Sequence, residues 1–176
     1  MIESIYVTNF KSLGNVELKL GKFTCLIGMN GSGKSTVLQA IDFISQLMVG
    51  RVDEWLDARG WSVADLNCKL RKQSNVNVGV QFKTSTGKTL AWDGSFNRSQ
   101  LRCTGEIIQL DSERIFQVAN QKYNIADRAD QNIAFTYQGS LLSALKESEL
   151  TDELLEFRNA IQQIKSLELL SPQLLR

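Results

Sequence analysis

The chain has 176 residues, of which 43% are hydrophobic and 22% are charged, and its formal net charge is +1. This composition is typical of a folded chain with one core, or one core and a small lobe, and it excludes a disordered chain. The near-neutral charge excludes an overall basic field, so nucleic-acid binding would require a local patch. No apolar run approaches the length of a membrane span, and the first residues lack the basic start and apolar core of a signal peptide. We therefore expect a cytoplasmic protein.

Cysteine and histidine usage excludes several kinds of site. The three cysteines, Cys25, Cys68 and Cys103, are too scattered for a disulfide framework or a zinc site with paired ligands, so we expect reduced thiols. The chain has no histidine, which excludes a histidine acid, base or metal ligand. The densest basic run, at residues 69–72, is either a solvated face or a local nucleic-acid contact.

Two strand-like segments open the chain, at residues 4–10 and 16–20. Gly14 and Asn15 are residues suited to a turn between them. We therefore expect two strands ahead of the first motif that carries chemistry.

A phosphate-loop pattern follows, in the stretch CLIGMNGSGKSTVLQAI at residues 25–41. Gly28 and Gly33 are separated by four residues and followed by Lys34-Ser35, which matches G-x-x-x-x-G-K-[ST]. Such a loop must connect a buried strand to a helix. The apolar run at residues 23–27 predicts a strand covered on both faces, and apolar residues at helical spacing predict a helix that stops at Gly50. Both flanks favour a phosphate loop over a chance glycine-rich turn.

The residue types of this loop indicate its chemistry. Its glycines permit backbone conformations and close approaches that a side chain would block. The amides of residues 30–35 can form an anion-binding concavity that continues into the positive end of the helix dipole. Lys34 is expected to reach the β- and γ-phosphates as the catalytic residue, and Ser35 to bind Mg²⁺. The residues expected to bind the nucleotide in this loop are Gly28, Asn30, Gly31, Ser32, Gly33, Lys34, Ser35 and Thr36.

The middle of the chain is predicted to be rich in strands. Residues 52–59 predict a helix, and segments at 76–82, 89–92 and 106–110 predict an antiparallel arm. A second Gly-Lys-Thr triplet, in TGKT at residues 86–89, fails as a phosphate loop because Phe82 stands where the first glycine is required. The alternating apolar residues before it predict a strand that runs into a hairpin turn at residues 85–88.

A helix is predicted near the end of the chain. Thr151 can cap it, and Asp152 and Glu153 fall in its first turn. It carries an apolar stripe at Leu154, Phe157, Ile161 and Ile164, which core packing or a partner helix would explain equally well.

The stretch IYVTNFKSLGNVELKLGKFTCLIGMNGSGKSTVLQAIDFI, residues 5–44, resembles the amino-terminal end of the ABC-type ATPases of the SMC, RecF and OLD-like group. In that group an opening strand ending in NF(K/R)S precedes a second strand, GxNGSGKS and a helix with an alanine such as Ala40. Nucleoside kinases usually start with the phosphate-loop strand itself. The resemblance implies an α/β fold of the P-loop NTPase type, an ABC-ATPase-like first lobe with a mixed or antiparallel sheet around the Walker A helix.

The resemblance also implies further site residues. Residues 9–12 would lie near the nucleotide, so Lys11 is either a phosphate or base contact or a solvent-facing lysine. Gln138, after the apolar-aromatic segment NIAFTY and before a helix, resembles the Q-loop glutamine that coordinates Mg²⁺; a surface glutamine is the alternative. Asp111 and Glu113 are not the Walker B pair, because those carboxylates are adjacent in this group and follow a signature helix that the chain lacks.

We therefore expect one nucleotide-binding lobe: strands, Walker A loop and helix at 1–50, a β-rich arm at 51–131, and a Q-loop-like segment and helix at 132–176. Since the carboxylates and signature helix of a working head are missing, and the chain ends in LELLSPQLLR, we expect an amino-terminal portion of a longer head.

The resemblance implies ATP and Mg²⁺ as ligands and a head-to-head homodimer, or the missing second half, as partner. DNA is a possible partner, in DNA repair, chromosome maintenance or anti-phage defence, and no membrane is expected. The alternatives are a module that senses ATP without hydrolysing it or, less well supported, an ABC transporter subunit.

Overall fold

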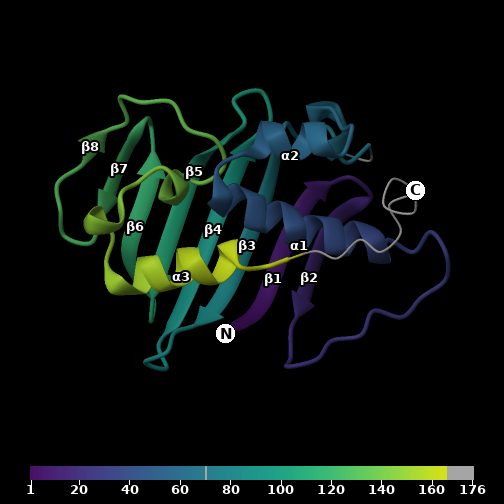
Figure 1. Cartoon of the computed structure of the whole chain (residues 1–176), viewed down its shortest axis with the longest axis horizontal. Helices are drawn as coiled ribbons and strands as arrows, with labels where there is room; N and C mark the ends of the chain where they lie inside the picture. Colours follow the sequence, from purple (N-terminus) through teal and green to yellow (C-terminus); the bar gives the residue numbers. More distant parts are fainter. Residues whose placement is uncertain (70, 166–176) are drawn as a thin grey trace.

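The computed structural model describes residues 1–69 and 71–165, which form one sheet and its helices (Figure 1). The strands are β1 (Ile2–Phe10), β2 (Leu13–Lys19), β3 (Asn75–Lys83), β4 (Thr89–Asn97), β5 (Arg102–Leu110), β6 (Glu113–Ala119), β7 (Lys122–Ile125) and β8 (Gln131–Asn132). The helices are α1 (Lys34–Val49), α2 (Val52–Ala58) and α3 (Asp152–Gln162), with short 3-10 helices η1 (Val63–Leu66), η2 (Leu141–Ser143) and η3 (Glu147–Glu149).

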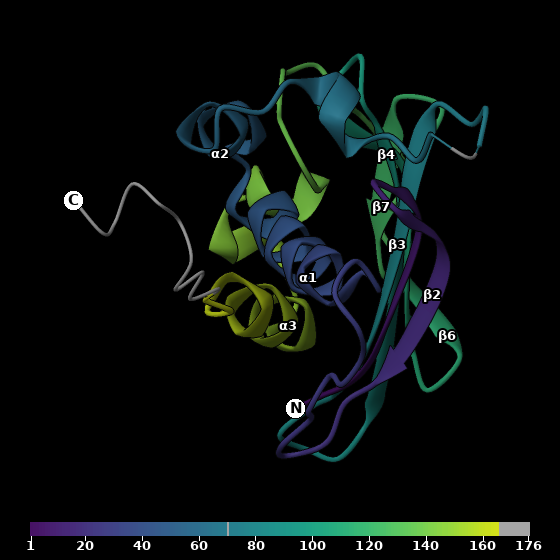
Figure 2. The ribbon, with the colours of Figure 1, turned by 90° about the vertical axis from the view of Figure 1, so that its right-hand side faces the viewer.

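The sheet has the order β2-β1-β3-β4-β5-β6-β7-β8, and every neighbouring pair is antiparallel. β1 lies between β2 and β3, and the strands from β3 onward follow one another as a meander. The α-helices lie on one face of the sheet, and no described helix covers the other (Figure 2). This arrangement around α1 agrees with the predicted α/β class. Among the described residues, no helix is both long enough and apolar enough to span a membrane.

The core lies between α1 and the sheet, and aromatic rings dominate its centre. Phe43 on α1 is fully buried and stacks on Phe10 of β1, with ring centroids 5.3 Å apart. The same ring meets Phe96 of β4 edge-on at 5.1 Å and Trp55 of α2 at 5.6 Å. These contacts fix α1 against the strands and α2 against α1.

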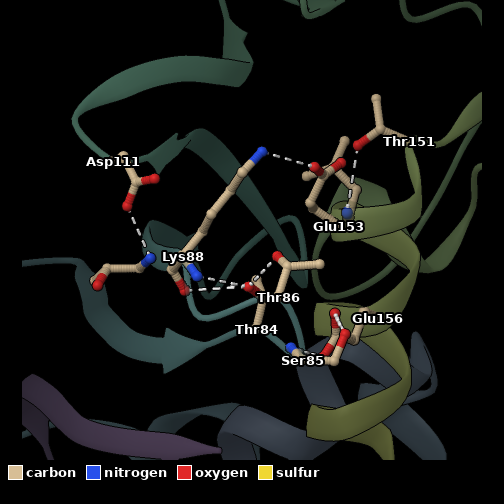
Figure 3. A network of polar contacts seen from close by, with 10 residues as sticks. Thr84, Ser85, Thr86, Lys88, Asp111, Thr151, Glu153 and Glu156 are labelled. Carbon is tan, nitrogen blue, oxygen red and sulfur yellow. Dashed lines mark hydrogen bonds and ion pairs between the residues drawn. The ribbon is translucent and has the colours of Figure 1, made fainter.

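The β3–β4 hairpin is joined to α3 by the polar network in Figure 3. Ser85 donates to the Glu156 carboxylate from its backbone N at 2.7 Å and from its Oγ at 3.1 Å, and Lys88 Nζ lies 3.5 Å from Glu153 Oε1. The predicted hairpin is confirmed. Lys88, the lysine of the second Gly-Lys-Thr triplet, forms an ion pair with Glu153 of α3, so its role is structural.

The predicted helix near the chain end is confirmed as α3. Thr151 caps it by accepting a hydrogen bond from the backbone N of Leu154. Leu154, Phe157 and Ile161 are buried, and the Phe157 ring contacts the rings of Phe82 and Trp92. The apolar stripe is therefore explained by core packing. The segment LELLSPQLLR lies outside the described residues.

The structure differs from the sequence-based expectation in three segments. Residues 23–27 form no strand: Phe23 and Ile27 are 88% and 91% exposed, because no described strand runs beside them to accept their backbone hydrogen bonds. The β1–β2 turn falls at residues 11–12, so Gly14 and Asn15 lie inside β2. In the segment NIAFTY before Gln138, residues 132–137, only Asn132 lies in a strand, at the end of β8.

A buried carboxylate joins the sheet to the segment after Gln138. Glu106 of β5 accepts hydrogen bonds from Trp92 Nε1 at 3.0 Å, from the Ser140 hydroxyl and from the backbone N of Leu141 at 2.7 Å. Burial raises the pKa of Glu106 to about 7, although these three donors oppose the rise. The carboxyl therefore binds its proton more tightly in the folded chain than in the unfolded one.

This difference predicts a stability that falls with rising pH. Between pH 4.5 and about 7, the usual and folded pKa values of Glu106, the folded state holds more protons than the unfolded state, so the free energy of unfolding decreases as pH increases. The loss from this group is up to about 3 kcal/mol and is complete above the folded pKa. Urea titrations across this range should show the slope in the wild type and a flatter profile in Glu106→Gln; equal slopes in both would contradict the assignment.

The aromatic centre predicts a second stability effect. Phe43→Ala removes a fully buried ring with contacts on three elements, so we expect the free energy of unfolding to fall by about 3–5 kcal/mol in urea denaturation. Leu38→Ala on the same helix is the control, since Leu38 is 50% exposed and its loss should change stability by no more than about 0.5 kcal/mol. Equal losses in the two variants would be inconsistent with this core.

Candidate functional site

The phosphate loop leads directly into α1. Gly31 and Gly33 have φ of +80° and +91°, in the left-handed region that favours glycine, and Gly33 is the residue before the helix. The backbone N of Val37 donates to Gly33 O at 3.0 Å, so the earlier amides of the first turn remain at the open end of the helix. The first turn of α1 contains no acidic side chain. The start of α1 therefore offers backbone donors and the positive end of a dipole to an anion.

Lys34 folds back across this loop. Its Nζ donates to Gly28 O and Met29 O, both at 2.7 Å, and lies 3.4 Å from Ser32 Oγ. A Cβ at position 28 would lie 2.7 Å from Ser32 Oγ, so a side chain there would displace the Ser32 hydroxyl. The ammonium group thus lies inside the curve of the loop, where a phosphate would replace carbonyl oxygens as its partner.

The β1–β2 turn lies against the beginning of α1. Ser12 Oγ and Thr36 Oγ1 are 3.1 Å apart, and Lys11 Nζ donates to Gln39 Oε1 at 3.1 Å. Asn9 braces the turn: its Nδ2 donates to the carbonyls of residues 73 and 75, both at 2.8 Å. The structure therefore brings Lys11 and Ser12 to the same end of α1 as the phosphate loop.

A cavity of about 470 Å³ opens beside this turn. It is lined by Lys11, Ser12, Trp61, Ala64, Asp65, Asn67 and Lys69. Lys11 Nζ lies over the Trp61 ring, 2.9 Å from its centroid. A hydrogen bond from the Ser62 side chain lowers the pKa of Asp65, and the charges of Lys11 and Lys69 lower it further. The cavity thus combines an aromatic wall with groups of both charges.

The aromatic wall is anchored to α1 by a partly buried ion pair. Asp42 of α1 accepts hydrogen bonds from Trp55 Nε1 at 2.7 Å and from the Arg59 guanidinium. The Trp55 and Trp61 rings meet edge-on at 5.4 Å, and Arg59 lies over both. The helix that starts at the phosphate loop therefore also positions Trp61.

Gln138 lies at the other end of α1. Its Oε1 accepts a hydrogen bond from the backbone N of Asp53 at 3.1 Å, and the adjacent Ser140 N donates to Leu47 O at 2.7 Å. Gly139 has φ +67°, and a Cβ there would lie 2.2 Å from Leu47 O, so this contact is tight. Since 16 residues of α-helix span about 24 Å, the structure does not bring Gln138 and Ser35 together as one metal site.

Asp111 and Glu113 lie away from the phosphate loop. Both belong to the β5–β6 hairpin, where Asp111 Oδ1 accepts a hydrogen bond from the backbone N of Thr89 at 2.9 Å. This agrees with the prediction that they are not Walker B carboxylates. Trp61 and Asn67 were not predicted as cavity residues, because no spacing rule connects them to Lys34, which lies 27 and 33 positions earlier in the sequence.

Comparison with protein families gives a match to the AAA domain over residues 4–173. The chain is 32% identical over 108 residues to the OLD nuclease of Thermus scotoductus, an alignment that covers 60% of this chain and 18% of the nuclease. It is 34% identical over 101 residues to the DNA replication and repair protein RecF of Paenarthrobacter aurescens, covering 56% of this chain and 25% of RecF.

The solved structures that resemble this chain include an SMC ATPase, which comes from work on ATP-driven dimerization and DNA-stimulated activation of SMC ATPases. It is 22% identical, covers 64% of this chain and 70% of that chain, and superposes with a TM-score of 0.45. The alignments with the OLD nuclease and with RecF show that the chain spans about a quarter or less of the length of these two relatives. Because the family match extends over nearly all of its residues, the chain belongs to the AAA domain family, with relatives in the SMC, RecF and OLD-like group.

Proposed function

We propose that this chain binds the triphosphate of ATP at residues 28–36, with Lys11 as a further contact. The proposal rests on the glycine loop, in which Gly31 and Gly33 have left-handed backbone conformations. This loop leads into the start of α1, where no acidic side chain in the first turn offsets the positive end of the helix dipole. Its backbone N–H groups and the Lys34 ammonium are the donors that a negatively charged phosphate requires. Lys11, held by Gln39 one to two turns into the same helix, extends the positive surface beyond the loop.

Mg²⁺ accompanies the nucleotide in this proposal, with the exposed Ser35 hydroxyl as its protein ligand. The described residues contain no group of three or more His, Cys, Asp or Glu side chains able to hold a metal. The ion must therefore take most of its ligands from phosphate and water, as Mg²⁺ commonly does. Gln138, the other residue expected to bind Mg²⁺, lies at the far end of α1. We therefore propose Ser35 as the protein ligand of Mg²⁺ among the described residues, and nucleotide binding as the function of this lobe.

We also propose that this lobe acts within a larger ATPase head, as a head-to-head homodimer or with a second half. The apolar residues Phe23 and Ile27, which precede the phosphate loop, and Met29 within it are 85–91% exposed. Exposed apolar residues in an extended segment are suited to pairing with a strand from another segment. The chain also spans only a small fraction of the length of its relatives, which supports the same proposal.

A role with DNA completes the proposal, in repair, chromosome maintenance or anti-phage defence. Two observations support this role: relatives of the chain are named for DNA replication and repair, and basic residues are concentrated in segments near the phosphate loop. Residues 11–12 at the β1–β2 turn, and residues 67–69 and 71–74 before β3, contain basic residues and no acidic one. Such a rim could contact a phosphate backbone despite the near-neutral net charge.

Nucleotide binding can be tested with a matched pair of lysine variants. Lys34→Ala should abolish saturable Mg²⁺-ATP binding in calorimetry. The substitution removes the ammonium group that, among the described residues, lies inside the loop. Lys88→Ala, which alters the second Gly-Lys-Thr triplet, should bind as the wild type does. Binding that survives Lys34→Ala, or that disappears equally in both variants, would contradict the site.

A further inference from the structure

We propose that the uncovered face of the sheet binds an arginine side chain of a partner protein, with the Asp93 carboxylate as its acceptor. This inference goes beyond the proposed nucleotide site, which lies on the side of the helices. The ring of Trp92 in β4 contacts Phe157 of α3, so Trp92 faces the helices. Because side chains alternate between the faces of a strand, Asp93 lies on the other face. No described helix covers that face (Figure 2).

A glycine leaves a gap beside Asp93. The strand register forms one row across the sheet, which contains Tyr6 of β1, Gly79 of β3, Asp93 of β4 and Ile107 of β5. A Cβ at position 79 would lie 3.0 Å from Asp93 Oδ1 and 3.5 Å from Tyr6 Cβ, so the carboxylate is directed over this gap. The gap belongs to a cavity of about 200 Å³, and a second cavity of about 380 Å³ extends from Tyr6 and Asp93 to Ile107.

The Asp93 carboxylate lacks a partner for its charge. It is accessible to solvent, but within the part of the chain that the structure describes it forms no hydrogen bond and no ion pair. Partial burial raises the pKa of this carboxyl, and no donor or positive charge opposes the rise. The described residues that line the two cavities include no lysine or arginine, whereas Glu17, opposite Tyr6, adds a second carboxylate. This surface is therefore complementary to a positively charged group.

Arginine fits this surface better than lysine or a metal ion does. A guanidinium group is planar, donates two parallel hydrogen bonds to a carboxylate and stacks on an aromatic ring. The gap at Gly79 has the carboxylate of Asp93 on one side and Tyr6 on the other. Tyr6 and Ile107 are 36% and 39% exposed, so they offer apolar contacts to the residues that flank the arginine. Aromatic residues and arginine are enriched at protein interfaces, which favours a protein segment as the occupant.

Two peptides test this site: acetyl-Leu-Arg-Leu-amide, and the same peptide with citrulline, which keeps the shape of arginine without its charge. In NMR titrations of the ¹⁵N-labelled chain, we expect the arginine peptide to shift the amide signals of residues 79, 93 and 107. It should bind about tenfold more tightly than the citrulline peptide. Asp93→Asn should remove this preference. Asp127→Asn, which removes the charge of another exposed aspartate outside this row, should retain it.

Every other result would overturn the inference. Equal affinities for the two peptides, binding of neither, or an unchanged preference in Asp93→Asn would each do so. Sedimentation should show the same monomer in the wild type and in Asp93→Asn, since self-association that the substitution abolishes would make a second copy the occupant instead.

The nucleotide site can be assessed separately in the same samples. Mg²⁺-ATP binding should be the same in the wild type and in Asp93→Asn, because Asp93 faces away from α1. If the wild type binds no ATP while the arginine preference is present, the proposed function fails and this inference stands. ATP binding without the arginine preference gives the reverse result.

Discussion

The packing of α1 against the sheet is the constraint on which the rest of this structure depends. Phe43 places the helix between Phe10 and Phe96, which fixes its position across β1 and β4. Because α1 is rigid over 16 residues, this packing also fixes where its first amides point. The phosphate loop needs no strong contacts of its own with the sheet, since the helix that follows it is already held.

The same helix gathers residues that are distant in sequence. Thr36 and Gln39 hold the β1–β2 turn, Asp42 holds the α2 aromatic wall through Trp55 and Arg59, and Leu47 holds the segment after Gln138. Each turn of α1 thus organises a different part of the molecule on one side of the sheet. Groups at the first turns lie at the proposed nucleotide site, whereas groups at the last turn contribute to packing.

Sequence patterns predicted much of this fold because local rules applied. Alternation located β3, helical spacing bounded α1 and its glycine stop, and the cap at Thr151 located α3. The strand expected at residues 23–27 did not form, since a strand needs a neighbour and apolar content cannot supply one. The phosphate loop was readable because its residues are contiguous. Trp61 and Asn67 join it only through tertiary contacts that no spacing rule encodes.

Amide hydrogen exchange with and without Mg²⁺-ATP would locate the nucleotide site, because it reports on each segment of the chain separately. We expect bound nucleotide to slow exchange at residues 28–36, with additional protection at residues 11–12 and 61–67. Exchange at residues 138–142, at the opposite end of α1, should not change. Unchanged exchange at residues 28–36, or protection centred on Gln138, would contradict a nucleotide site at the start of this helix.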